Sequence, residues 1–138
     1  MNAIDKFYIQ DKIAVITGGA GLLGRKHADA VIEGKGIPVL IDISESAIGS
    51  AKEELRVKYG DACIVEGYVA DITDSDQMEK IAADLLSKYG HADILINNAA
   101  NNPKVEGNAA NMKAIQFENF SMRMWLDDLN VGLTGAFI

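Results

Sequence analysis

The sequence predicts an α/β fold in which a parallel sheet is doubly wound, with helices on both faces. Four apolar runs rich in β-branched residues recur along its 138 residues. Segments of helical length with amphipathic spacing separate these runs, and a glycine-rich turn follows the first of them. Strands and helices that alternate at intervals of about 25–30 residues are typical of parallel strands joined by right-handed crossovers. We therefore expect an open parallel sheet within residues 1–138, with the strand order 3-2-1-4.

The predicted strands are almost continuously apolar. They cover residues 13–17, 37–42, 62–67 and 92–97, which read IAVIT, IPVLID, ACIVEG and ADILIN. A strand that faces water on one side would alternate between apolar and polar residues instead. These runs therefore indicate strands that are covered on both faces.

One helix is predicted directly after the glycine-rich turn, and a last one from about residue 122. Two more are predicted over residues 44–59 and 74–89. Ser44 can cap the first of these two, and Asp74 or Ser75 the second. Both end in Lys-Tyr-Gly, where glycine can take the left-handed conformation that closes a helix. Apolar residues recur at helical spacing in both: Ala47, Ile48, Ala51 and Leu55 in the first, and Met78, Ile81, Ala82, Leu85 and Leu86 in the second. The polar, asparagine-rich stretch 98–121 is long for a connection, which favours a functional loop.

The turn TGGAGLLG, residues 17–24, points to a dinucleotide. Glycines at a turn from a strand into a helix let the backbone bend sharply and let a phosphate approach the main chain. The free N–H groups at the helix start attract an anion. Asp42 ends the second strand, 18 positions after Gly24, where a carboxylate can accept hydrogen bonds from an adenosine ribose and repel a 2′-phosphate. The alternative is a purely structural turn, and Arg25 and Lys26 leave room for a phosphorylated ribose.

Further candidate residues follow the third and fourth strands. Asp71 and Ile72 follow the third, and the run 97–100, NNAA, follows the fourth. Open α/β sheets bind ligands at the carboxyl ends of their strands, and small residues there would let a cofactor lie against the backbone. The asparagines could instead cap loose carbonyl groups.

Composition narrows the possible partners and location. The formal net charge is −7, which argues against nucleic acid or an anionic membrane as the main partner. None of the apolar runs approaches the roughly 18 residues of a membrane span. Cys63 is the single cysteine, and with no signal-like N-terminus we expect a reduced, cytoplasmic protein. His27 and His91 are isolated, so no metal site is predicted.

Together, these motifs resemble the short-chain dehydrogenase/reductase family. The likeness runs from IAVITGGAGLLG through VADITD and DILINNAA to LNVGLTGAF. It implies a Rossmann fold, NAD or NADP as cofactor, and hydride transfer to or from a carbonyl or carbinol of a small-molecule substrate. It also implies homo-oligomers for the full-length protein.

The resemblance assigns roles to the residues found above. It implies that Gly18, Gly21, Gly24 and the backbone at Leu23 hold the pyrophosphate. Asp42, with Ile43 beside it, would favour NAD over NADP, and Asp71 and Ile72 would contact the adenine. Asn98, Ala99 and Ala100 would line the ribose on the nicotinamide side.

Three positions depart from the family pattern. Leu22 stands where TGxxxGxG has glycine, so the spacing TGxxGxxG fits through Gly21, and we expect Leu22 to face the core. Ala100 replaces a usual glycine. Gly132 replaces the asparagine of a proton relay, and Asn130 lies about 200° away around a regular helix.

The catalytic tyrosine and lysine of the family are spaced Y-x-x-x-K, and no such pair is assigned anywhere in this sequence. Tyr8, Tyr59, Tyr68 and Tyr89 lie in segments remote from that role, so no catalytic residue is assigned. We expect the chain to be the N-terminal part of a longer single-domain enzyme, with its fourth strand left as an apolar edge that invites association.

Two alternatives to an enzyme remain. One is a non-catalytic dinucleotide-binding or regulatory module, and the other is a structural fragment that folds on a partner. For the enzyme, the run NNAANNPKVEG resembles a subgroup found with flagellin and surface-sugar modification. That likeness implies a sugar or sugar-derived polyol as substrate.

Overall fold

A four-stranded parallel sheet forms the centre of the molecule. The computed structural model describes residues 7–101 and 116–138. The strands are β1 (Ile13–Thr17), β2 (Ile37–Asp42), β3 (Glu66–Val69) and β4 (Ile94–Ile96). Their order is β3-β2-β1-β4, which confirms the predicted fold class and topology. All residues of β1 are buried, because β1 is flanked by strands and covered on both faces.

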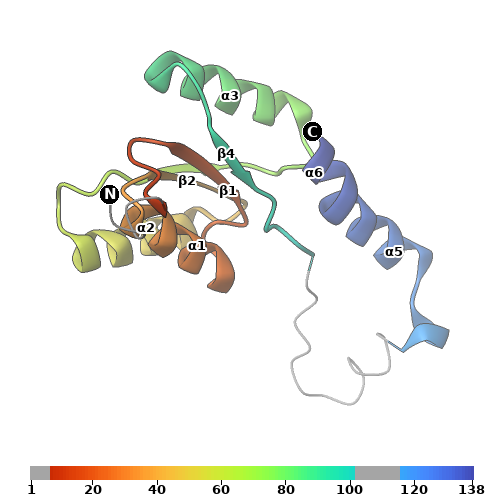
Figure 1. Cartoon of the computed structure of the whole chain (residues 1–138). Coiled ribbons are helices and arrows are strands. Elements are labelled where there is room, and N and C mark those ends of the chain that lie inside the picture. Colours follow the sequence, from red (N-terminus) through yellow and green to blue (C-terminus); the bar gives the residue numbers. More distant parts are fainter. Residues whose placement is uncertain (1–6, 102–115) are drawn as a thin grey trace.

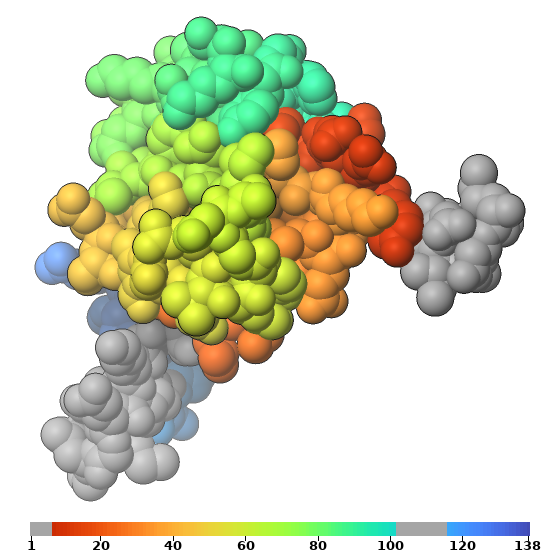
Figure 2. Space-filling view, turned by 90° about the vertical axis from the view of Figure 1, so that its left-hand side faces the viewer, coloured from red at the N-terminus to blue at the C-terminus, as the bar shows by residue number. Residues whose placement is uncertain are grey.

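Helices cover the two faces of the sheet (Figure 1). On one face, α1 (Leu22–Glu33) and α2 (Glu45–Tyr59) pack on Ala14, Ile16 and Leu40. On the other, α3 (Ser75–Tyr89) packs on Ile13, Val15 and Val39. Alternate residues of β1 thus point into two separate cores, as the two-residue period of a strand requires. Figure 2 shows the outer surfaces of α2, in yellow to lime, and α3, in green.

The predicted helix ends are confirmed. The hydroxyl of Ser44 accepts a hydrogen bond from the N–H of Ala47 at 3.2 Å. The carboxylate of Asp74, rather than Ser75, caps α3 by accepting from the N–H of Gln77 at 3.1 Å. Gly60 and Gly90 follow the two helices with φ angles of +90° and +77°, in the region that favours glycine.

Four expectations about individual segments are wrong. The third strand is Glu66–Val69 rather than 62–67, because its register is set by pairing with Val39–Asp42 of β2. Residues 62–65 connect α2 to the sheet instead, and the fourth strand is shorter than 92–97. Leu22 is 82% exposed rather than facing the core, because it is the first residue of α1, whose buried residues begin at Gly24. In α3, Ile81 and Leu85 are buried, whereas Ala82 and Leu86 are exposed.

The last helical segment begins at Met122, as predicted. It comprises α5 (Met122–Leu129), a π-helical turn η3 (Asn130–Thr134) and α6 (Gly135–Phe137), preceded by the short η2 (Phe117–Asn119). It stands beside the sheet in Figure 1. It docks at η3 and α6, where Val131 packs on the core beneath α3. A Cβ on Gly135 would lie 2.7 Å from the side chain of Ile72, so Gly135 allows this close approach.

Much of the asparagine-rich stretch 98–121, including Pro103, lies outside the described residues. Within the described residues, β4 is an edge strand, and Leu95 on it is 60% exposed. Each helix in the described part of the chain is too short or too polar to span a bilayer.

Candidate functional site

A cavity of about 240 Å³ opens at the carboxyl end of the sheet. The segments that follow all four strands meet there, together with η3. Seven of the residues singled out from the sequence line it: Gly18, Asp42, Ile43, Asp71, Ile72, Ala99 and Ala100. The fold thus brings together residues that are up to 82 positions apart in the sequence.

The glycine-rich turn is packed so tightly that side chains are excluded. Gly18 has a φ of +61°, and a Cβ there would lie 2.9 Å from the Cα of Ala99. A Cβ on Gly24 would collide with the carbonyl oxygen of Gly18. Gly21 caps α1, and its carbonyl accepts from the N–H of Arg25 at 3.1 Å. The turn therefore needs glycine at 18 and 24 for steric reasons alone.

The turn also leaves backbone donors available at the start of α1. The first N–H groups of a helix, here those of Leu22, Leu23 and Gly24, have no acceptor within the helix. The side chain of Leu23 is 63% exposed, so Leu23 contributes its backbone N–H to the site rather than its side chain. Together with the helix dipole, these donors make a binding place for an anion.

The carboxylate of Asp42 holds the surrounding backbone. One oxygen accepts from the N–H of Ala20 at 3.2 Å, and the other accepts from the N–H of Ser44 at 3.2 Å. Each carboxylate oxygen has two lone pairs, so both can accept a further hydrogen bond from a ligand. Ile43, beside it, is 75% exposed and forms part of the cavity rim.

Asp71 and Ile72 form the opposite side of the cavity. The carboxylate of Asp71 accepts from the N–H and the hydroxyl of Thr73, at 2.9 and 2.7 Å. Ile72 is 7% exposed and belongs to the core. The pair thus combines a fixed polar group with an apolar surface, which suits a flat heterocycle.

Asn98 is turned away from the cavity. Its side-chain amide donates to the carbonyl oxygens of Thr17 and Gly18, at 3.0 and 3.1 Å. The hydroxyl of Thr17 accepts from the N–H groups of Asn98 and Ala99, at 3.0 and 3.1 Å. Asn98 therefore ties the end of β4 to the glycine-rich turn, and Ala99 and Ala100 reach the cavity from that anchor.

Four further residues line the cavity, and the sequence reasoning did not single them out: Ile41, Ala70, Asn101 and Val131. Ile41, Ala70 and Asn101 are sequence neighbours of predicted site residues, and this position at the strand ends could have identified them. Asn101 also donates to the carboxylate of Asp128 in α5 at 2.9 Å. Val131 comes from a distant helix, and only the tertiary structure places it there.

The tyrosines do not assemble a proton-transfer centre at this cavity. Burial and the carboxylate of Glu66 raise the pKa of Tyr89 to about 12. Burial and Asp84 likewise raise the pKa of Tyr68. A general acid or base works best with a pKa near the operating pH. The raised pKa values therefore make Tyr68 and Tyr89 less suited to that role.

Tyr8 and Lys12 do have the Y-x-x-x-K spacing in the sequence, but the structure separates them from the cavity. Lys12 precedes β1 at the amino end of the sheet and donates to the carboxylate of Asp93 at 2.7 Å. The ring of Tyr8 lies 4.3 Å from the ammonium group of Lys35. Both residues are thus at the opposite end of the strands.

Comparison with known proteins gives one consistent family. The family model of short chain dehydrogenases matches residues 12–138. A short chain dehydrogenase/reductase, dpchG, of Colletotrichum higginsianum is 38% identical over 89 residues, which are 64% of this chain and 32% of the relative. A sorbitol dehydrogenase of Cereibacter sphaeroides is 33% identical over 92 residues, 67% of this chain and 34% of the relative.

A solved structure shows the same fold at low identity. It is described as a putative D-mannonate oxidoreductase from Haemophilus influenza with bound NAD. Its TM-score is 0.77 at 20% identity, over 99% of this chain and 50% of that one. The present chain therefore spans about half the length of that protein, and the matched regions cover about a third of the curated relatives.

Proposed function

The chain belongs to the short-chain dehydrogenase family, and from that premise we propose that it is the nucleotide-binding part of a nicotinamide-dependent oxidoreductase. The observation that carries the proposal is the cavity at the carboxyl end of the sheet. Gly18 of the glycine-rich turn and Asp42 both line it, and the N–H of Ala20 in that turn donates to the Asp42 carboxylate. Whole ligand pockets commonly have volumes of about 300–1,000 Å³, so a cavity of about 240 Å³ suits one nucleoside of a dinucleotide.

The adenosine half would occupy this cavity. Asp42 would accept hydrogen bonds from the ribose hydroxyls, with Ile43 at the rim, and its negative charge would disfavour a 2′-phosphate. Asp71 and Ile72 would contact the adenine. This assignment makes NAD the preferred cofactor over NADP.

The pyrophosphate would lie at the start of α1. Gly18, Gly21 and Gly24 let it approach the backbone, and the N–H groups at Leu23 and Gly24 would donate to its oxygens. The close packing at Gly18 and Gly24 would keep these N–H groups in place, because any side chain there would displace the turn.

The nicotinamide half would lie toward Ala99 and Ala100, with Asn98 fixing their backbone. When bound, the nicotinamide ring would donate a hydride to the substrate carbonyl or accept one from the substrate carbinol. The catalytic tyrosine and lysine would lie outside residues 1–138, because Tyr8 and Lys12 are at the wrong end of the sheet. Residues 1–138 alone would then bind the cofactor without turnover.

For the substrate we propose a sugar or sugar-derived polyol, as in flagellin or surface-glycan modification. The likeness of the run 97–107 to such enzymes and the sorbitol dehydrogenase relative support this class. We further propose that the full-length protein is cytoplasmic and forms homo-oligomers.

Calorimetry and a turnover assay on the full-length protein test the proposal together. We expect one equivalent of NADH to bind per chain, and NADH oxidation with at least one member of a panel of ketoses and sugar-derived carbonyl compounds. Binding without turnover on any carbonyl compound would favour the non-catalytic dinucleotide-binding module. Absence of NADH and NADPH binding would refute the proposal.

A further inference from the structure

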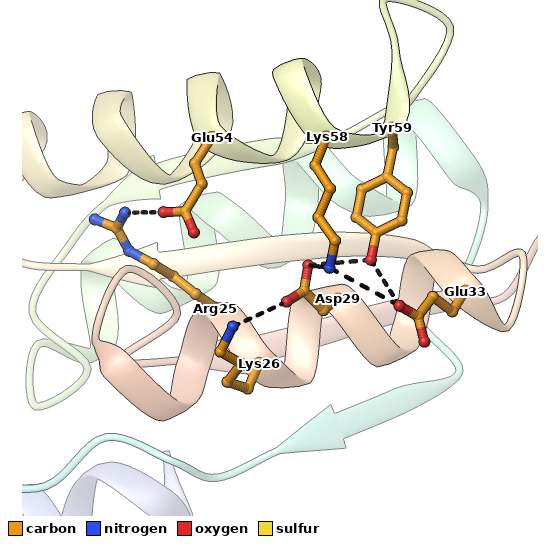
Figure 3. A network of polar contacts seen from close by, with 7 residues as sticks. All are labelled: Arg25, Lys26, Asp29, Glu33, Glu54, Lys58 and Tyr59. Atoms are coloured by element: carbon orange, nitrogen blue, oxygen red, sulfur yellow. Dashed lines mark hydrogen bonds and ion pairs between the residues drawn. The ribbon is translucent and has the colours of Figure 1, made fainter.

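The side chain of Arg25 makes four polar contacts, one with the glycine-rich turn and three with α2. It follows Gly24 directly and lies between α1 and α2 (Figure 3). Its Nε donates to the carbonyl oxygen of Ala20 at 2.9 Å. Its terminal nitrogens donate to the carboxylate of Glu54 at 2.5 Å, and to the Ser50 hydroxyl and the Ala47 carbonyl at 3.4 Å each.

The peptide groups of Ala20 link Arg25 to Asp42. The Ala20 carbonyl accepts from Arg25, while its N–H donates to the carboxylate of Asp42 at 3.2 Å. One residue in the middle of the turn is therefore held from both sides, by a cation and by an anion. Charge-assisted hydrogen bonds of this kind are stronger than neutral ones, so the pair fixes the turn relative to Asp42.

Glu54 limits which other groups the Arg25 guanidinium can bind. Arg25 does not line the cavity, but Ala20 contacts both its guanidinium and Asp42. The planar donors of a guanidinium match the oxygens of a 2′-phosphate. The Glu54 carboxylate neutralises it and engages one of its terminal nitrogens. Lys26, the next basic residue, is directed to Asp29 at 3.4 Å instead, as Figure 3 shows.

We propose that Glu54 is a cofactor-specificity determinant that acts through Arg25. Arg25 is a positioning residue for the glycine-rich turn, and Glu54 keeps its charge from being offered to the phosphorylated dinucleotide. The inference rests on the proposed function. It adds Glu54, a residue of α2 that does not line the cavity, to Asp42 as a determinant of selectivity against NADP.

The test compares Glu54→Ala with Glu53→Ala in the full-length protein. Both residues are on α2 and about equally exposed, and Glu53 is ion-paired with Arg56 at 2.7 Å. Both changes remove one negative charge and introduce the best helix former, so net charge and helix stability stay matched. We expect Glu54→Ala to improve NADPH affinity relative to NADH by about tenfold, and Glu53→Ala to leave the ratio unchanged.

The double variant Arg25→Met/Glu54→Ala identifies the group responsible. We expect it to lose the gain in NADPH affinity, because the guanidinium is gone. If Glu54→Ala does not change the ratio, if Glu53→Ala changes it equally, or if the double variant keeps the gain, the specificity role is refuted.

Amide hydrogen exchange gives a readout that needs no cofactor. In Arg25→Met we expect faster exchange across residues 18–24, centred on Ala20, with α3 unaffected. Unchanged exchange there would refute the positioning role. If the wild type binds neither dinucleotide, the proposed function and the selectivity fail together. Faster exchange in Arg25→Met would still establish that Arg25 holds the turn.

Discussion

At the scale of single residues, two glycines in helices have opposite environments. Gly24 lies in α1, where a Cβ would collide with the carbonyl oxygen of Gly18, while a Cβ on Gly49 in α2 would meet nothing within 4 Å. We expect Gly24→Ala to lower the free energy of unfolding by about 3 kcal/mol, because backbone must move. We expect Gly49→Ala to raise it by about 1 kcal/mol through helix propensity.

Urea unfolding of both variants measures the difference. A Gly24→Ala protein as stable as the wild type would mean that α1 can move away from the turn at little cost. The close packing would then not explain the glycine.

Asp42 is the single residue to which we assign the proposed preference for NAD. Asp42→Asn keeps the size of the side chain but removes its charge, so the ribose hydroxyls lose a charged acceptor. We expect NADH affinity to fall about tenfold and the penalty on NADPH to shrink. Parallel titrations with both cofactors measure this, with the exposed Asp61→Asn as control. An unchanged ratio of the two affinities would contradict the assignment.

At the scale of elements, a polar network joins α1 to α2. Asp29 of α1 is ion-paired with Lys58 of α2 at 2.9 Å, and the hydroxyl of Tyr59 donates to it at 3.1 Å. The hydrogen bond from Lys58 lowers the pKa of Asp29 below its usual 3.8, and Tyr59 and Lys26 act in the same direction. Figure 3 shows these contacts together.

The lowered pKa makes stability depend on pH in a defined direction. As the pH falls, Asp29 is protonated in the unfolded chain before it is protonated in the folded protein, because its folded pKa is lower. The free energy of unfolding therefore decreases as the pH falls from about 5 through the folded pKa. We expect Asp29→Asn to flatten the dependence of the urea midpoint on pH in this acidic range. Asp61→Asn, with a side chain 96% exposed, should leave it unchanged. Equal slopes in wild type and Asp29→Asn would rule out a contribution from this pair.

Elements with strong local signals were predictable from the sequence. Caps such as Ser44 and closing glycines such as Gly60 are local chemistry, so α2 and α3 were placed to within a residue. β3 was misplaced because its register depends on β2, which no local pattern in residues 62–67 reveals. In the site, residues at strand ends were found, whereas Val131 and the Arg25–Glu54 pair depend on tertiary packing between distant segments.

At the scale of the whole molecule, β4 is an unpaired edge in the described part of the chain. Leu95 is 60% exposed on that edge, and exposed apolar edge strands promote association. We expect residues 1–138, prepared alone, to self-associate, and Leu95→Lys to reduce this by placing a charge on the edge. Sedimentation velocity measures the change. Association that is equal in both proteins would place the contact elsewhere, for example on the exposed Trp125 and Leu126 of α5.

A crystal structure of the full-length protein grown with NAD would show whether the cavity is a dinucleotide site. We expect the adenosine ribose within hydrogen-bond distance of Asp42 and the pyrophosphate on the N–H groups at Leu23 and Gly24. A dinucleotide bound at another place, with the cavity between Asp42 and Asp71 left empty, would contradict it.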